Sequence, residues 1–212
     1  MTGLQKGLLI GAVSFVLLIG ACTAGFYFKV YKPYAEPIMA MAISQALEDK
    51  QLKTRDFTKP GSGEVTAEQV RRFVAVEDEV EIKVANAAIS LADQQQVLER
   101  AEEAGTLTLQ TALGAFGAIK PVLMTAKPLQ IEAMNREHFS KREFEWVREQ
   151  LYRAAAIRLT RVDVSDMTSG APEPSIRVRT VPEQEIPPAN QALARPIAAK
   201  LQSWRSFAFF GL

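Results

Sequence analysis

The sequence predicts an all-α protein in which an N-terminal membrane anchor precedes a bundle of about four to five helices. Three observations support this fold class. An uncharged apolar run extends from Gly7 to Phe28, two capping boxes open long segments, and apolar residues recur there at spacings of three and four. We expect the anchor in residues 1–33 and one helical domain in residues 34–212, with a proline-rich loop at 162–190.

The apolar run from Gly7 to Phe28 has two interpretations, a membrane span and a lipoprotein signal. As a helix, its 22 residues would reach about 33 Å, which matches the hydrocarbon core of a bilayer. The run also contains Ile19-Gly20-Ala21-Cys22, which resembles a lipobox and makes Cys22 a candidate for lipidation. We favour the span, because apolar residues continue past Cys22 to an aromatic and basic border at 26–32.

The short amino-terminal tail indicates how the chain is oriented. Such a tail is typical of a signal anchor and places the rest of the chain outside the cytoplasm. In a bacterium we therefore expect an inner-membrane protein with a periplasmic domain, or a lipoprotein if Cys22 is modified.

Apolar spacing and start signals define the first helices of the domain. A first amphipathic helix is predicted to begin at Pro37. Its apolar residues are Ile38, Met39, Ala42, Ile43, Ala46 and Leu47. After a loop at 54–63, Thr66 and Gln69 form a capping box, and one long helix is predicted from there to a stop at Gly105.

The next segment, 106–134, is again apolar at helical spacing, but Pro121 and Pro128 predict a kink or a break near each. Ser140 and Glu143 form a second capping box.

The helix that follows this box is predicted to run to about Arg161, with Phe139 and Phe144 in the positions of a hydrophobic staple. Within the proline-rich loop, 175–181 alternates like a short strand for which the sequence offers no partner. A last helix is predicted to begin between 190 and 196.

The charge balance excludes some partners and suggests one helix pair. With 25 basic and 24 acidic residues, the chain lacks the global positive charge of a nucleic-acid-binding protein. Nine acids and four bases lie in 68–103, whereas seven bases and four acids lie in 136–161. These charges either cover solvated helix faces or set the register of two neighbouring helices.

The titratable residues do not form a recognisable catalytic or metal-binding set. His138 is the only histidine and Cys22 the only cysteine, so a histidine-rich or cysteine-built metal site is excluded. A hydrolase that combines His138 with Ser140 or Ser90 would lack the strand-turn-helix context of a nucleophile. We therefore predict neither enzymatic activity nor a cofactor.

Three segments resemble uncharacterised helical proteins that are anchored in bacterial envelopes. The segments are Val65–Val76, Phe139–Glu149 and Phe209–Leu212. The resemblance implies a bacterial origin and a helical fold, and it carries over no activity and no functional residue.

The leading hypothesis is a non-enzymatic, membrane-tethered module that binds another envelope protein or supports an assembly, with a homo-oligomer as one form of such an assembly. The alternative is a carrier or sensor of an apolar ligand. Its cleft would be lined by Met39, Met41, Phe116, Leu123, Met124 and Met134. At the end of the sequence, Phe207, Phe209 and Phe210 either pack on the protein's own helices or dock into a partner.

Overall fold

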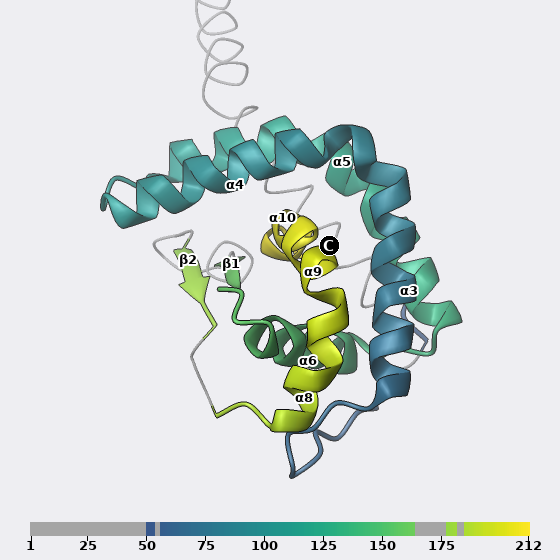
Figure 1. Ribbon diagram of the computed structural model, residues 1–212. Helices are drawn as coiled ribbons and strands as arrows, with labels where there is room; N and C mark the ends of the chain where they lie inside the picture. The colour runs from purple at the N-terminus through teal and green to yellow at the C-terminus, as the bar shows by residue number, and fades with distance from the viewer. Residues whose placement is uncertain (1–49, 54–55, 164–176, 182–184) are drawn as a thin grey trace, which may run out of the picture.

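The computed structural model describes residues 50–53, 56–163, 177–181 and 185–212 (Figure 1). The predicted anchor with Cys22 and most of the predicted first helix lie outside these residues. Helices predominate in the described part, which confirms the helical fold class. None of these described helices has the length and apolar character that crossing a bilayer requires.

The predicted long helix after Thr66 is in fact two helices. The capping box is confirmed, because the Gln69 amide donates to the Thr66 hydroxyl (3.1 Å) and the Thr66 amide donates to the Gln69 side chain (3.0 Å). Helix α3 (Ala67–Val84) then passes through a 3-10 turn (Ala85–Ala87) into α4 (Ala88–Glu103). Figure 1 shows that the chain changes direction sharply at this corner.

The corner allows the apolar stripes of both helices to face the same core. Val84 before the turn and Leu91 after it are both buried. A straight helix of this length would carry one of its ends away from the rest of the domain. No glycine or proline marks the turn at Ala85–Ala87, which is why the sequence pattern predicts a single helix.

Of the predicted kink or break at the two prolines, the break does not occur, because helix α5 (Leu109–Arg136) runs through both of them. It packs against α4 and α3 in turn and follows their change of direction (Figure 1). Counted in residues from the loop between α4 and α5, the stretch from Pro121 to Pro128 is about as distant as the 3-10 turn at Ala85–Ala87. The two therefore lie at about the same height along the paired helices. Because each proline removes one backbone donor from the helix, this stretch of α5 bends at lower cost than an ordinary helix.

Helix α6 (Lys141–Ala154) begins at the predicted cap, although only half of the second capping box forms. The Glu143 amide donates to the Ser140 hydroxyl (3.1 Å). The Glu143 carboxylate turns away from the cap and accepts from Arg72 (2.6 Å) and Gln69 (2.9 Å) of α3. The side chain that sequence reasoning assigned to the cap therefore joins two helices.

The prediction that this helix continues to about Arg161 is wrong, since α6 ends at Ala154. Ala156 has a left-handed backbone with φ of 56°. Its amide and the next one donate back to the carbonyls of Arg153 and Tyr152, both at 2.9 Å. This is a Schellman motif, which normally has glycine at the left-handed position, and the sequence offers alanine instead.

The early end of α6 provides a partner for the short strand that seemed isolated in the sequence. Strand β1 (Thr160–Asp163) pairs in antiparallel register with β2 (Arg177–Thr180), with Thr160 opposite Thr180. Part of the predicted loop 162–190 is therefore a two-stranded sheet, in addition to the described helices.

The last part of the chain runs through the middle of the domain. It consists of α8 (Pro188–Ala194), a 3-10 turn (Arg195–Ile197), α9 (Ala198–Ser203) and α10 (Arg205–Phe209). The predicted last helix is thus divided, with Pro196 in the 3-10 turn. Figure 1 shows α9 and α10 on the inner side of the corner that α3 and α4 form.

A row of aromatic rings connects this C-terminal segment to the two capped helices. Phe139 and Phe144 are 5.4 Å apart between ring centroids, which confirms the hydrophobic staple. Phe144 contacts Phe73 of α3 (5.3 Å), and Phe73 contacts Trp204 (6.1 Å). Trp146, on the same helix as Phe144, is also buried. The core is therefore centred where α3, α6 and the C-terminal segment meet.

We predict that replacing Ala156 with Gly stabilises the protein. Ala156 is exposed, and an L side chain in left-handed backbone costs about 1 kcal/mol, which glycine relieves. The free energy of unfolding in urea should therefore rise by roughly 0.5–1 kcal/mol. The matched control is Ala155→Gly, whose φ of −83° suits alanine and which should lower stability. A loss of stability in Ala156→Gly would contradict the assigned helix end.

Candidate functional site

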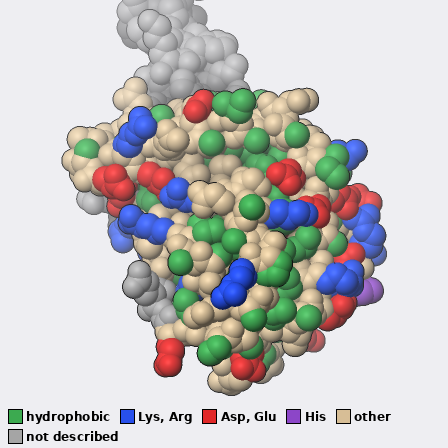
Figure 2. Space-filling view, viewed as in Figure 1, with side chains coloured by type: hydrophobic (Ala, Val, Ile, Leu, Met, Phe, Trp, Pro, Cys, Tyr) green, Lys and Arg blue, Asp and Glu red, His purple; other side chains and the backbone are tan. Residues whose placement is uncertain are grey.

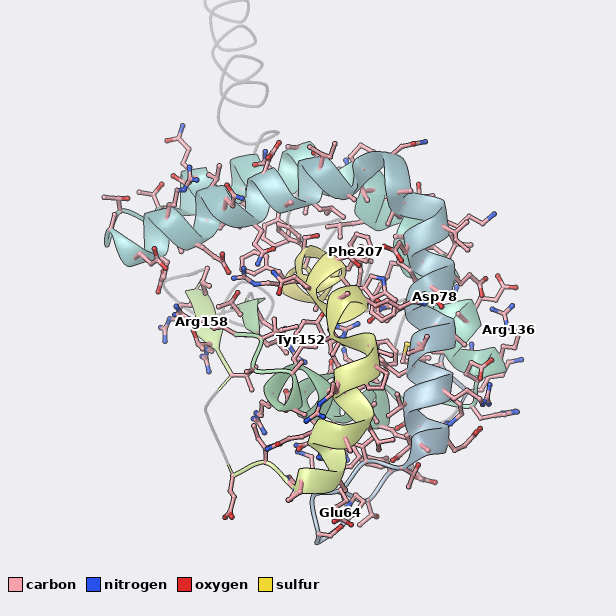
Figure 3. All side chains as sticks on the ribbon, in the orientation of Figure 1. Glu64, Asp78, Arg136, Tyr152, Arg158 and Phe207 are labelled. Carbon is pink, nitrogen blue, oxygen red and sulfur yellow. The ribbon has the colours of Figure 1, made fainter. Side chains whose placement is uncertain are left out.

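Glu77, Asp78, Glu79 and Glu81 are close in sequence on α3, but they do not converge on one ion. The four carboxylates point in different directions, as their consecutive positions on one helix require. Glu77 contacts Arg148, Asp78 accepts from Lys200 (2.5 Å), Glu79 pairs with Arg136, and Glu81 accepts from Trp204 (2.9 Å). Figure 3 shows Asp78 on α3 and Arg136 on the outer side of the domain, with Tyr152 and Phe207 inside it. Each carboxylate thus serves a separate contact.

Glu77 and Arg148 form an ion pair in the centre of the core. They are 1% and 3% exposed, and Arg148 Nη2 donates to Glu77 Oε1 at 3.0 Å. The same nitrogen donates to the main-chain oxygen of Leu212, and the guanidinium lies 4.7 Å from the ring centroid of Phe144. One side chain of α6 therefore holds both α3 and the last residues of the sequence.

Several polar atoms around this pair have no hydrogen-bond partner in the part of the protein that the structure describes. Within the described residues, Glu77 Oε2, Arg148 Nε and the Tyr152 hydroxyl are buried without a hydrogen-bond partner. Burial raises the pKa of the Glu77 carboxyl, an effect that the attraction of Arg148 opposes. Burial, reinforced by the Glu77 charge, also raises the pKa of the Tyr152 hydroxyl above its usual range.

Two further polar contacts hold the C-terminal segment. Lys127 of α5 donates to the Gly211 carbonyl (2.6 Å) and to Gln130 (2.9 Å). Glu99 of α4 accepts from Arg205 (2.7 Å) and from the Thr160 hydroxyl (2.5 Å). Together with Glu77, Glu81 and Arg148, these contacts connect the segment to all four long helices.

The described pocket is an open groove at the C-terminal end of α5. It has a volume of about 510 Å³. Its lining residues are Gln51, Lys53, Pro128, Ile131, Glu132, Asn135 and Arg136. Asn135 donates to the Gln51 carbonyl (2.9 Å) and accepts from the Lys53 amide (2.8 Å), so one wall of the groove is the incoming chain. Five of the seven lining residues carry charged or amide side chains, although more of the lining surface is apolar than polar.

The other residues that the sequence singled out are Cys22, the three C-terminal phenylalanines, His138 and Ser140. Cys22 is outside the described residues. Phe207 and Phe209 are each 1% exposed, and Phe210 is half-buried with its ring 5.6 Å from Phe116. His138 is exposed in the left-handed position after α5 (φ 55°), while Ser140 is the cap of α6. The structure therefore places the three phenylalanines in contact with the protein's own helices.

The described residues contain no group of three or more His, Cys, Asp or Glu side chains that could hold a metal ion. Acidic and basic side chains are interspersed over the face in Figure 2. Comparison with protein-family models, curated proteins and solved structures finds no match to this chain.

Sequence reasoning missed the buried partners Arg148 and Asn190. Arg148 lies four residues from Phe144 and three from Leu151, so it stands in the apolar stripe of its helix. Asn190 is fully buried, accepts from the Val65 amide (2.8 Å) and donates to the Gly63 carbonyl (3.0 Å). A signal existed for Arg148, whereas the contacts of Asn190 span more than a hundred residues and leave no local pattern.

We predict that Glu77 makes the protein relatively less stable as the pH rises. Because its pKa is higher in the folded chain, its contribution is fully present below the ordinary value of 4.5 and is lost as pH rises through the folded-state value. Urea titrations of the wild type and of Glu77→Gln measure this effect. The free energy of unfolding of the wild type minus that of the variant should fall as the pH is raised from 4.5.

The control for this experiment is Glu68→Gln. Arg71 lowers the pKa of the exposed Glu68 carboxyl through a hydrogen bond. The free energy of unfolding of the wild type minus that of Glu68→Gln should therefore rise, if it changes at all, as the pH is raised. If the Glu77 difference rose with pH, the attraction of Arg148 would outweigh burial.

Proposed function

We propose that this chain is a non-enzymatic, membrane-tethered helical module that binds another protein of a bacterial envelope. The apolar run at 7–28 supports the tether. The charged groups of the core support a non-enzymatic role, since Glu77, Arg148 and Lys127 are engaged in contacts between elements of the chain itself.

The observation that carries the proposal is a pair of exposed isoleucines at the corner between α3 and α4. Ile82 is 74% exposed and Ile89 is 76% exposed. Two other large apolar residues of the described part are exposed, but less so: Val97 at 43% and Met124 at 38%. Ile82 lies midway between the buried residues Val80 and Val84, and Ile89 lies two residues before the buried Leu91. On a helix this spacing directs both isoleucine side chains away from the core.

These two side chains suit a protein contact better than an intramolecular one. Each lies within one turn of the corner, where the bend presents the ends of both helices to the outside. Exposed isoleucines beside polar residues such as Asn86 form the apolar centre and polar rim that protein interfaces use. We therefore assign the partner surface to this corner.

The alternative, an apolar-ligand carrier, has less support. Phe116, Leu123 and Met134 are buried in the core, so they are not available to line an open cleft, while Met124 is exposed. Met39 and Met41 lie outside the described residues. The groove beside Asn135 has the volume for a small ligand, but five of its seven lining residues carry charged or amide side chains.

The proposal predicts that Ile82→Asp and Ile89→Asp each abolish partner binding without unfolding the domain. Because both side chains are exposed, the free energy of unfolding should change by no more than about 0.5 kcal/mol. A photo-reactive residue at position 82 or 89 of the membrane-bound protein should cross-link to one common protein, and the aspartate at the other position should remove that cross-link.

Gln191→Asp adds the same charge at an exposed position of α8 and should leave the cross-link intact. Cross-links to many unrelated proteins, or a common cross-link that persists in both aspartate variants, would refute the assigned surface.

A further inference from the structure

The outward face of α5 is unlike that of the other long helices. The stretch of α5 from Gly114 to Pro128 is fully described, and its exposed residues carry no charge. They include Gly114, Gly117, Ala118, Pro121, Met124 and Pro128. In contrast, α3 exposes Arg71 and Lys83, and α4 exposes Asp93 and Arg100. These α5 positions recur at three and four residues, so they form one continuous stripe.

The chain enters the described part of the domain at one end of this stripe. Lys50 and Gln51 have helical backbone, and Leu52 is buried in the core. Both hydrogen bonds of Asn135 hold this entry point against the last turn of α5. The residues before Lys50 therefore start beside Pro128 and Ile131, which share a groove with Gln51.

The segment before Lys50 has the length and the pattern to cover the stripe. As a helix, the 13 residues of 37–49 would extend about 20 Å, and Gly117–Pro128 extends about 17 Å. The sequence gives this segment an apolar stripe of its own, which includes Ile38, Ala42 and Leu47. Small residues such as Gly117 and Ala118 allow two helix backbones to approach closely.

We propose that the outward face of α5 is the docking surface for residues 37–49 of the same chain, which lie parallel to α5. Asn135 contacts Gln51 and Lys53, which sets the register and brings Ile38 near Pro121 and Ala42 near Met124. Phe28, the last residue of the uncharged apolar run, is then separated from the docked segment by eight residues, 29–36.

Docking would shorten the connection between the domain and the membrane. Eight extended residues span at most about 28 Å, whereas the 21 residues from 29 to 49 would span about 75 Å. The part of α5 near Gly117 would therefore be held close to the bilayer. This consequence rests on the proposed anchor, but the docking itself does not.

Cysteine cross-linking tests the docking in the full-length chain, with Cys22→Ala as background. Ile38→Cys combined with Pro121→Cys should give about tenfold more intramolecular product with a short thiol cross-linker than the control pair Ile38→Cys and Gln96→Cys, because Gln96 is exposed on α4. Met124→Asp, added to the first pair, should reduce the product to the control level.

Val97→Asp is the matched charge control, since Val97 and Met124 are similarly exposed on neighbouring helices, and it should leave the product unchanged. A product at the mass of two chains would assign this face to a second copy and overturn the proposal. Product no greater than that of the control pair would also overturn it. Because the readout requires no partner protein, failure here is distinguishable from failure of the proposed function.

Discussion

The C-terminal segment fills the inner side of a bent helical frame, and the other elements depend on that packing. Trp204 is fully buried, and Phe207 and Phe209 are each 1% exposed. Burying one such ring contributes roughly 1.5–3 kcal/mol, so these residues alone represent a large part of the stability that a domain of this size can have. α3, α4, α5 and α6 would otherwise enclose an apolar space that this segment occupies.

The bend of the frame and the position of the segment have a common physical cause. If α3 and α4 formed one straight helix, their apolar stripe could pack only along a straight line. The turn at Ala85–Ala87 lets the apolar stripes of both helices pack against the same core. α5 follows because Pro121 and Pro128 have already removed two backbone hydrogen bonds. The polar contacts of Arg148, Lys127 and Glu99 then satisfy groups that the segment brings into the core.

Arg148 also explains how two helices of opposite charge come to pack together. The pair with Glu77 is buried in the core, where removing either partner leaves an unpaired buried charge. Arg72 and Glu143 form a second link between α3 and α6 with the signs exchanged (2.6 Å). Register between these helices is therefore specified twice, which supports the interpretation of the charge pattern as a guide to pairing.

The sequence predicts those parts of the fold that have local causes. Thr66 with Gln69, Ser140 and the pair Phe139–Phe144 all act within one helical turn, and each is found where the pattern places it. The end of α6 escapes prediction because Ala156, without the usual glycine, adopts the left-handed backbone.

Features that depend on distant residues are harder to predict. The pairing of β1 with β2 depends on residues that are distant in sequence. The core ion pair was accessible in principle, since Glu77 and Arg148 both occupy apolar stripe positions and carry opposite charges. In contrast, the groove at Asn135 forms because Gln51 and Asn135, which are more than eighty residues apart in sequence, lie side by side.

The proposed partner corner and the docking face lie on different helices, which gives the domain two separate outward surfaces. Ile82 and Ile89 belong to α3 and α4, whereas the uncharged stripe from Gly114 to Pro128 belongs to α5. If the stripe holds the chain that leads to the membrane, the corner is left for a partner. The tether and the interaction then act through one rigid core.

Native-state amide hydrogen exchange in Phe207→Ala tests most directly whether the C-terminal segment is the centre of that core. Removing this buried ring should cost about 3–5 kcal/mol. Because α3 and α6 pack on the segment, the account predicts that protection falls together in Ala67–Val84, Lys141–Ala154 and Arg205–Phe209. Loss of protection confined to the last residues, with α3 and α6 unchanged, would contradict it.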